Sequence, residues 1–362
     1  MRSGGRLAQR QAGGSPSTSS PPMSVEQTQR YLVTGACGCI GTWVLRELLA
    51  AGAYVVAFDV SDDAGRMRLV IGEQDLARVV WLRGNVAELA ALEHALDEHM
   101  ITRVIHLAAL QVPFCRADPP HGALVNVVGT TNVFEAVADR QDRIGPVVYA
   151  SSVAAYDAID DRHAESQRGT MVATPSTMYG VYKRANEAGA GVYASERGLA
   201  SVGLRPHTVY GVGRDQGLTA APTFAMLAAA AGVRYHIPFG GRCQLQYAQD
   251  VARAFVQATE APSDGAVVHD LAGPSVEFED VIAAIERCRS DANGLITCGT
   301  RPLPFLDHVD GVSLAEHVGP VPQTPLADGV RETVERFANL LARGAIGCDA
   351  VLAGPPRGRR VR

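Results

Sequence analysis

Short apolar segments alternate with amphipathic helical patterns along the first two thirds of the chain. This alternation predicts an α/β fold with a doubly wound parallel sheet covered by helices on both faces. The predicted strands are Tyr31–Thr34, Tyr54–Phe58, Val79–Leu82, Arg103–Leu107, Val147–Ala150 and Ser201–Leu204. The predicted helices lie near residues 41–51, 88–99, 121–140 and 178–197. A last strand and helix are predicted near Ala266–Leu271 and residues 277–289.

After about Gly211 the pattern loosens, because glycine and proline recur up to Gly241. We expect a core over residues 30–210 and, over residues 211–345, mainly a smaller substrate-binding region that includes the returning strand and helix of the core. A final amphipathic helix is predicted over Ala327–Ala342, whereas the proline-rich segment 300–326 predicts no element that we can place. The chain shows no internal repeat.

Composition is that of an ordinary globular protein, with 47% hydrophobic and 20% charged residues. No apolar stretch approaches the roughly 18 residues of a membrane span, so we expect no membrane association. The two ends differ from the middle: they hold no acid but seven arginines, without which the formal net charge of −5 becomes −12. A body this acidic is a poor general binder of polyanions, and no nucleic-acid partner is expected.

We expect residues 1–22 to be a disordered leader and residues 346–362 a disordered basic tail. The leader lacks the apolar segment of a secretory signal. Its arginines and serines fit an organelle transit peptide, but disorder or a start at Met23 explains them more simply. Seven scattered cysteines, among them Cys37 and Cys39 with no second pair, predict reduced thiols, no metal site and a cytoplasmic protein.

A glycine-rich turn follows the first predicted strand, in the order Gly35, Gly38 and Gly41. Gly35 permits a tight turn, Gly38 lets the backbone approach a pyrophosphate, and Gly41 allows the helix to pack closely on the strand. The free amides and the positive end of the helix dipole then bind the phosphates. This strand–turn–helix context predicts a Rossmann-type dinucleotide site.

Asp59 ends the second predicted strand, 18 residues after Gly41, close to the expected spacing of about 20. An acid at this position accepts hydrogen bonds from ribose hydroxyls and repels a 2′-phosphate. The predicted cofactor is therefore NAD rather than NADP.

Tyr179 and Lys183 are four residues apart, so a helix places them on one face. A tyrosine with a pKa near 10 is a poor base at neutral pH. We expect Lys183 and the positive nicotinamide ring to lower the pKa of Tyr179, which favours general acid–base catalysis. Ser152 follows the fifth predicted strand, where it can stabilise charge on the reacting oxygen.

These segments resemble the extended short-chain dehydrogenase/reductase family, of the NAD-dependent epimerase/dehydratase type, over roughly residues 30–345. Thr34–Gly41, His106–Ala109, Ser151–Tyr156, the Tyr179 and Lys183 pair, and Leu204–Gly211 match its motifs in order. The resemblance implies that Tyr179 is the acid/base, that Lys183 binds the nicotinamide ribose and tunes Tyr179, and that Ser152 orients the substrate. It also implies a homodimer formed through the helices at 121–140 and 178–197. The cofactor contacts that follow from the motifs are Gly35, Gly38, Cys39, Ile40, Gly41, Asp59, Asn85, Val86, Leu107, Ala108, Ala109, Asn126, Tyr179, Lys183 and Pro206.

Three segments depart from the family pattern. Gly84-Asn85 replaces the frequent Gly-Asp that contacts adenine, and Tyr182 replaces a small residue in the catalytic segment. The stretch from Gln244 to Asp250 lacks the arginine that would hold a nucleotide diphosphate. This last difference argues against a nucleotide-sugar substrate without excluding one.

The candidate substrate contacts are Gln111, Ser152, Tyr179 and Arg214. Arg214 can clamp a carboxylate or phosphate bidentately, or it can pair with a surface acid, and the sequence leaves both readings open. His106 and His207 lie in no metal-binding spacing, so we expect them to pack or to bond locally.

Three functions are compatible with these residues. We favour an NAD-dependent oxidoreductase that acts on a hydroxyl or keto group of a sugar, sugar acid or similar small polyol. The alternative is a nucleotide-sugar epimerase or dehydratase that retains NAD tightly. A dinucleotide sensor without catalysis is the remote alternative, since such proteins often lose the tyrosine or the lysine.

Overall fold

The computed structural model describes residues 29–156, 175–304 and 306–347. The predicted disordered leader, and the predicted basic tail from residue 348 on, lie outside these residues. No described helix is long and apolar enough to cross a membrane.

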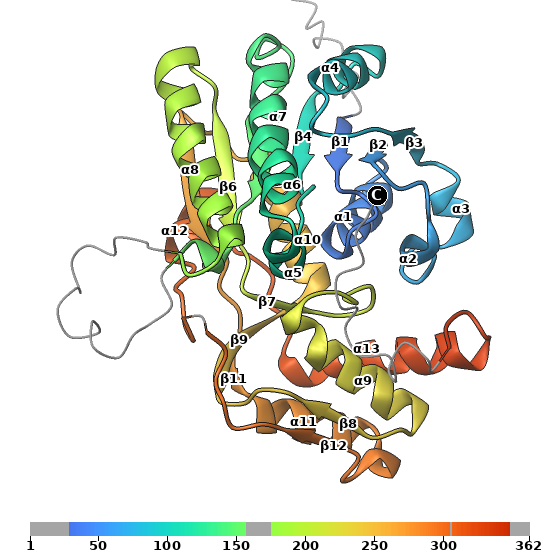
Figure 1. Cartoon of the computed structure of the whole chain (residues 1–362). Helices are drawn as coiled ribbons and strands as arrows, with labels where there is room; N and C mark the ends of the chain where they lie inside the picture. The colour runs from blue at the N-terminus through green and yellow to red at the C-terminus, as the bar shows by residue number, and fades with distance from the viewer. Residues whose placement is uncertain (1–28, 157–174, 305, 348–362) are drawn as a thin grey trace, which may run out of the picture.

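A seven-stranded parallel sheet forms the centre of the molecule, as predicted (Figure 1). Its strand order is β10-β6-β5-β4-β1-β2-β3. The strands are β1 (Arg30–Thr34), β2 (Tyr54–Asp59), β3 (Val80–Arg83), β4 (Arg103–His106), β5 (Val147–Ala150), β6 (Ser201–Arg205) and β10 (Ala266–Asp270). The last strand returns from the C-terminal half to pair with β6.

Two hydrophobic layers cover the sheet because neighbouring strand residues point to opposite faces. On one face Leu32 packs in a cluster with Leu92, Phe134 and Ala190. These come from the helices α4 (Leu89–Glu98), α7 (Gly129–Ala138) and α8 (Met178–Arg197). On the other face Val33 belongs to a cluster with residues of α1 (Cys39–Ala50) and α10 (Ala248–Ala258). Short helices α2 (Gly65–Arg68) and α3 (Glu73–Leu76) join β2 to β3.

The helix predicted near residues 121–140 is confirmed, but a π-helical turn interrupts its regular α-helical pattern. It consists of α6 (Pro119–Ala123), the π-helical turn (Leu124–Val128) and α7, and the short helix α5 (Val112–Ala117) precedes it. Asn126 lies in this turn, and its carbonyl accepts hydrogen bonds from Thr130 Oγ1 at 2.8 Å and Asn186 Nδ2 at 2.9 Å. These side-chain donors compete with the regular helical bonding pattern, and such π-helical turns are frequent at functional sites.

The second half of the chain adds small sheets below the strand ends of the main sheet (Figure 1). One sheet contains β7 (Thr208–Tyr210), β9 (Arg242–Tyr247) and β11 (Ser275–Glu277), and the other pairs β8 (Tyr235–Ile237) with β12 (Ile296–Cys298). The helices here are α9 (Ala221–Ala231), α11 (Phe278–Cys288), α12 (Val312–Val318) and α13 (Leu326–Ala342). The helices predicted near 277–289 and over Ala327–Ala342 are thus confirmed, whereas β7, β8, β9, β11, β12, α9, α10 and α12 were not predicted.

Candidate active site

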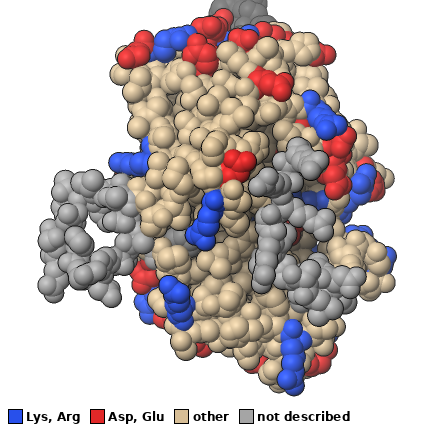
Figure 2. Space-filling model, viewed as in Figure 1, with Lys and Arg blue, Asp and Glu red and all other residues tan. Residues whose placement is uncertain are grey.

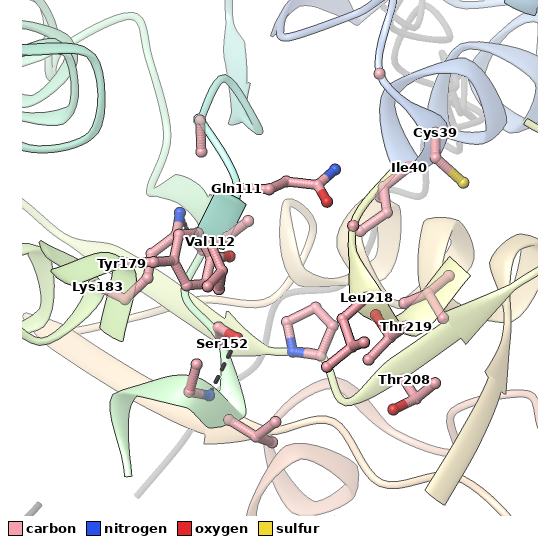
Figure 3. A pocket seen from close by; sticks show the side chains of 18 of the residues that line it. Cys39, Ile40, Gln111, Val112, Ser152, Tyr179, Lys183, Thr208, Leu218 and Thr219 are labelled. Atoms are coloured by element: carbon pink, nitrogen blue, oxygen red, sulfur yellow. Dashed lines mark hydrogen bonds between the residues drawn. The ribbon is translucent and has the colours of Figure 1, made fainter. Parts of the chain in front are cut away.

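A cavity of about 280 Å³ lies at the carboxyl ends of the central strands. Parallel sheets bind ligands at this edge. Figure 3 shows Tyr179 and Lys183 on one side of the cavity, Cys39 and Ile40 on the other, and Gln111 between them. The predicted site residues in its lining are Gly35, Gly38, Cys39, Ile40, Gly41, Leu107, Ala109, Gln111, Ser152, Tyr179, Lys183, Pro206 and Arg214.

The glycine turn has the geometry that a bound phosphate requires. Gly35 has φ +68°, and a Cβ there would lie 2.5 Å from the backbone nitrogen of Ala108. A Cβ on Gly41 would lie 2.3 Å from the Gly35 carbonyl oxygen. The helix α1 begins at Cys39 with no side-chain cap, so its first amides have no helical partners and are free for an anion.

Asp59 stands at the end of β2, outside the cavity lining. Its Oδ2 accepts a hydrogen bond from the Cys37 amide at 3.0 Å, and its Oδ1 accepts one from the Ser61 amide at 3.0 Å. Each carboxylate oxygen still has a lone pair for a ribose hydroxyl. The turn, the uncapped helix and this acid together fit a dinucleotide such as NAD.

The other predicted cofactor contacts also lie outside the lining. Asn85 Oδ1 accepts a hydrogen bond from the Ala87 amide at 3.0 Å, and Val86 packs against Gly129. The Ala108 amide lies 3.4 Å from Thr34 Oγ1. Asn126 is fully buried, and its side chain bonds both the Leu110 amide and the Leu110 carbonyl. It therefore fixes the segment that follows β4, next to the cavity.

His106 forms a buried bridge between the glycine turn and the π-helical turn. Its Nδ1 lies 2.7 Å from Thr34 Oγ1, and its Nε2 lies 3.0 Å from Thr130 Oγ1. Burial, aided by the charge of Lys183, lowers the pKa of His106 to about 3. The imidazole is neutral and is hydrogen-bonded at both ring nitrogens, so His106 bonds locally, as expected. The described residues contain no cluster of three or more side chains able to hold a metal.

Lys183 is held in place rather than free to swing. Its ammonium donates a 2.6 Å hydrogen bond to the Ala150 carbonyl at the end of β5 and lies 5.6 Å from the centre of the Tyr179 ring. Burial lowers the pKa of Lys183 to about 8. It is the only lysine of the chain, in which every other long basic side chain is arginine.

The groups of the protein raise the pKa of Tyr179, so the part of the predicted lowering that was assigned to Lys183 is not seen. Removal from water raises this pKa, whereas the hydroxyl of Ser152 and the charge of Arg214 lower it. Lys183 does not contribute to this pKa shift, and its ammonium donates its hydrogen bond to the Ala150 carbonyl rather than to the Tyr179 hydroxyl. The protein groups alone therefore keep Tyr179 as a neutral phenol at pH 7.

A buried ionic network behind the site escaped the sequence analysis. Glu187 accepts hydrogen bonds from Ser151 Oγ at 2.5 Å and from Arg205 Nε and Nη2 at 2.6 and 2.8 Å. Arg205 also contacts Tyr156 and Asp270. Ser151 precedes Ser152, and Arg205 precedes Pro206, so the network fixes two cavity walls. Glu187 lies one turn after Lys183, which is a signal that could have revealed it.

Arg214 has no carboxylate partner among the described residues. Its Nη2 donates to Thr219 Oγ1 at 2.8 Å, and its buried Nε has no partner. Its neighbour Asp215 pairs instead with Arg66. Arg116, also missed, joins Arg214 and Lys183 in the cavity lining, which includes no Asp or Glu among the described residues. The cavity therefore suits an anionic ligand.

The strand β9 contains Gln244 and lacks the arginine that would hold a nucleotide diphosphate, and its side chains pack and bond within the protein. Gln244 is buried, donates to the Val309 carbonyl at 2.8 Å and accepts from the Val309 amide at 3.1 Å. His207 lines the cavity, but its ring accepts from the Thr208 amide and donates to the Leu306 carbonyl. Both side chains thus hold the segment that contains Leu306 and Val309, and His207 bonds locally as predicted.

Known proteins resemble this chain over most of its length. A UDP-glucose 4-epimerase of Mycolicibacterium smegmatis is 29% identical over 327 residues, covering 86% of this chain and 99% of that protein. The structure of a Thermus thermophilus UDP-glucose 4-epimerase in complex with NAD matches with a TM-score of 0.70 and 24% identity, covering 88% of this chain and 100% of that one. An L-threonine dehydrogenase from Clostridium difficile matches with a TM-score of 0.73 and 19% identity, covering 88% and 99%.

The model of the NAD dependent epimerase/dehydratase family matches residues 31–271, from β1 to the end of the main sheet. This match agrees with the parallel sheet and with the glycine turn described above. The chain therefore belongs to the NAD-dependent epimerase/dehydratase family of extended short-chain dehydrogenases/reductases and is an NAD-dependent enzyme.

Proposed function

We propose that this enzyme oxidises a hydroxyl group, or reduces the corresponding ketone, on a sugar acid or a similar small polyol that carries an anionic group. The observation behind the proposal is the cavity, where the catalytic trio Ser152, Tyr179 and Lys183 lies opposite the glycine turn and where Arg214 lacks a carboxylate partner among the described residues. A guanidinium that no described carboxylate pairs with, in a pocket whose described lining holds no acid, favours an anionic substrate.

In this mechanism Tyr179 takes the proton of the substrate hydroxyl as the alcohol becomes a carbonyl, and returns it in the reverse direction. Bound NAD would supply the acceptor for the hydride that leaves the same carbon. Ser152 donates a hydrogen bond to the reacting oxygen, and Lys183 holds the ribose while its ammonium stays near Tyr179. The phenol needs a lower pKa than the protein groups give it, and the positive charge of the bound cofactor acts in that direction.

The remaining contacts follow from their positions. The amides of Cys39, Ile40 and Gly41 at the start of α1 would hold the pyrophosphate, Gly35 and Gly38 would let it approach the turn, and Asp59 would hold the adenosine ribose. Asn85 and Val86 would border the adenine. Leu107, Ala108, Ala109, Asn126 and Pro206 would shape the nicotinamide half, and Gln111 with Arg214 would hold the substrate. The chain would thus divide into an NAD-binding core over residues 30–210 and, over residues 211–345, a region that mainly binds the substrate.

The test is NADH formation by purified enzyme with NAD and a panel of uronic and aldonic acids, each paired with its neutral sugar. We expect turnover with the acids and its loss in Arg214→Gln. A reaction that is indifferent to the carboxylate would contradict the proposal.

A second candidate is a nucleotide-sugar epimerase, favoured by the full-length similarity to a UDP-glucose 4-epimerase. Such an enzyme would recycle its cofactor. Purified protein that releases stoichiometric NAD on denaturation and interconverts UDP-sugars without net NADH would establish it in place of the first.

We also propose a cytoplasmic homodimer. Leu124 and Val128 of the π-helical turn and Val181 and Val192 of α8 are exposed apolar residues on neighbouring helices. Figure 2 shows few charged side chains on this face of the molecule. The six described cysteines are free, as a reducing compartment requires. Val192→Asp should convert a dimer to a monomer in light scattering, and a wild-type protein that is already monomeric would refute the dimer.

A further inference from the structure

A bidentate ion pair connects the first half of the chain to the loop that carries Arg214. Arg66 lies on α2, directly after β2, and Asp215 lies 149 residues further on. Arg66 Nη2 donates to both carboxylate oxygens, at 2.8 and 2.9 Å, and Nε donates to Oδ2 at 3.2 Å. Three donor contacts leave little of this guanidinium for another anion.

Arg66 belongs to the same small region as Asp59. Its Nη1 donates to the Cys37 carbonyl, while the Cys37 amide donates to Asp59 Oδ2 at 3.0 Å. The two side chains thus hold opposite ends of one residue in the glycine turn. Gly213, with φ +92°, lies against the Arg66 side chain, because a Cβ there would lie only 3.2 Å from Arg66 Cγ. The loop therefore packs directly onto the side chain that Asp215 binds.

An arginine near the acid that ends β2 is the usual partner of the 2′-phosphate of NADP. Here this arginine is neutralised by a carboxylate, which also adds negative charge beside the ribose position. Both effects disfavour a dianionic phosphate and leave the 2′-hydroxyl of NAD unaffected. Asp59 and Asp215 would then act together, one by repelling the phosphate and the other by occupying its natural partner.

We propose that Asp215 is a second determinant of NAD over NADP, which works by withholding the Arg66 guanidinium from the cofactor. The proposal rests on the proposed contact of Asp59 with the adenosine ribose. It does not depend on the identity of the substrate.

The experiment measures NADH and NADPH affinity of the purified full chain by fluorescence titration, without substrate. In Asp215→Asn we expect the preference for NADH over NADPH to fall about tenfold, the size of one charge-assisted hydrogen bond. Adding Arg66→Gln to Asp215→Asn should remove this gain in NADPH affinity. Asp97→Asn is the matched control, because Asp97 also pairs with arginines, Arg140 and Arg143, but lies on α4 outside the cavity lining.

An unchanged NADH to NADPH ratio in Asp215→Asn, with NADH binding intact, would overturn this proposal alone. A gain that persists without Arg66, or that appears equally in Asp97→Asn, would also overturn it, because net charge rather than the released guanidinium would then explain it. Wild-type protein that binds NADH but oxidises no sugar acid would instead count against the proposed function.

Discussion

The Lys183 ammonium donates a 2.6 Å hydrogen bond to the carbonyl of Ala150, the last residue of β5. This bond connects the helix that carries Tyr179 to the strand that leads into Ser152. It also explains how a buried cation is retained: the carbonyl replaces one of the water contacts that the ammonium loses. This contact therefore joins the two elements that carry Ser152, Tyr179 and Lys183, the residues proposed as catalytic.

The pKa of Lys183 can be measured directly because the chain has no other lysine. Burial lowers this pKa to about 8, so we expect the single Nζ resonance of ¹⁵N-lysine-labelled protein to titrate near pH 8. A side chain that stays charged up to its ordinary pKa would contradict the burial account.

Stability should follow the same titration. Between the folded pKa of about 8 and the ordinary value of 10.5, the unfolded chain binds more protons than the folded chain, so stability rises with pH across this window. Lys183→Met removes the cost of the buried charge, although it leaves the Ala150 carbonyl without its donor. We expect a gain of about 1 kcal/mol at pH 7 that disappears above pH 10, as measured by urea unfolding at several pH values. A variant less stable at pH 7 than at pH 10, relative to wild type, would refute this.

Tyr179→Phe should lower turnover by about 100- to 10,000-fold, the usual contribution of a general acid or base. NADH affinity should change little, because the phenol acts on the substrate oxygen. The measurement combines steady-state rates with a fluorescence titration. A Tyr179→Phe enzyme with the turnover of wild type would contradict the acid/base role of Tyr179.

Ser152→Ala should shift the pH dependence of the oxidation upward. The hydroxyl of Ser152 lowers the pKa of Tyr179, so its loss leaves the effect of burial less opposed, and the phenol is deprotonated at a higher pH. The expected readout is a higher pH for half-maximal kcat/KM in addition to a lower maximum. A reduced rate with an unmoved profile would mean that Ser152 contacts the substrate without affecting Tyr179.

Glu187→Gln should destabilise the protein by about 3 kcal/mol, because it leaves the buried Arg205 without its main carboxylate partner. Ser151→Ala, which removes one hydrogen bond to the same carboxylate, should cost about 1 kcal/mol. Urea unfolding of both variants provides the comparison. Equal losses would show that the ion pair contributes nothing beyond an ordinary hydrogen bond.

The central sheet was predictable because each of its strands is a short apolar run bounded by turn residues. The unpredicted strands β8, β11 and β12 are three residues long, too short for a pattern. The helix α9 is buried along nearly its whole length, so no polar face marks its period. In α10 half-buried polar residues such as Gln249, Arg253 and Gln257 recur at four-residue spacing among buried positions, and that signal was present but overlooked.

The site divides in the same way. The glycine turn and the Tyr179 and Lys183 pair are local motifs, so spacing alone brings their members together. The pairs of Arg66 with Asp215 and of Arg205 with Asp270 join residues far apart in the chain, and only the sheet topology places them side by side. The predicted contribution of Lys183 to a lower Tyr179 pKa was wrong because a pairwise spacing argument omits burial, whereas the contribution of a bound nicotinamide stays a prediction.

The most direct test of the proposed function is the rate of NADH formation with a sugar acid and with its neutral counterpart, in wild type and in Arg214→Gln. We expect wild type to prefer the acid by at least about tenfold, and the variant to lose this preference while it still binds NADH. No NADH with any acid, together with interconversion of UDP-sugars on retained NAD, would contradict the account and establish an epimerase.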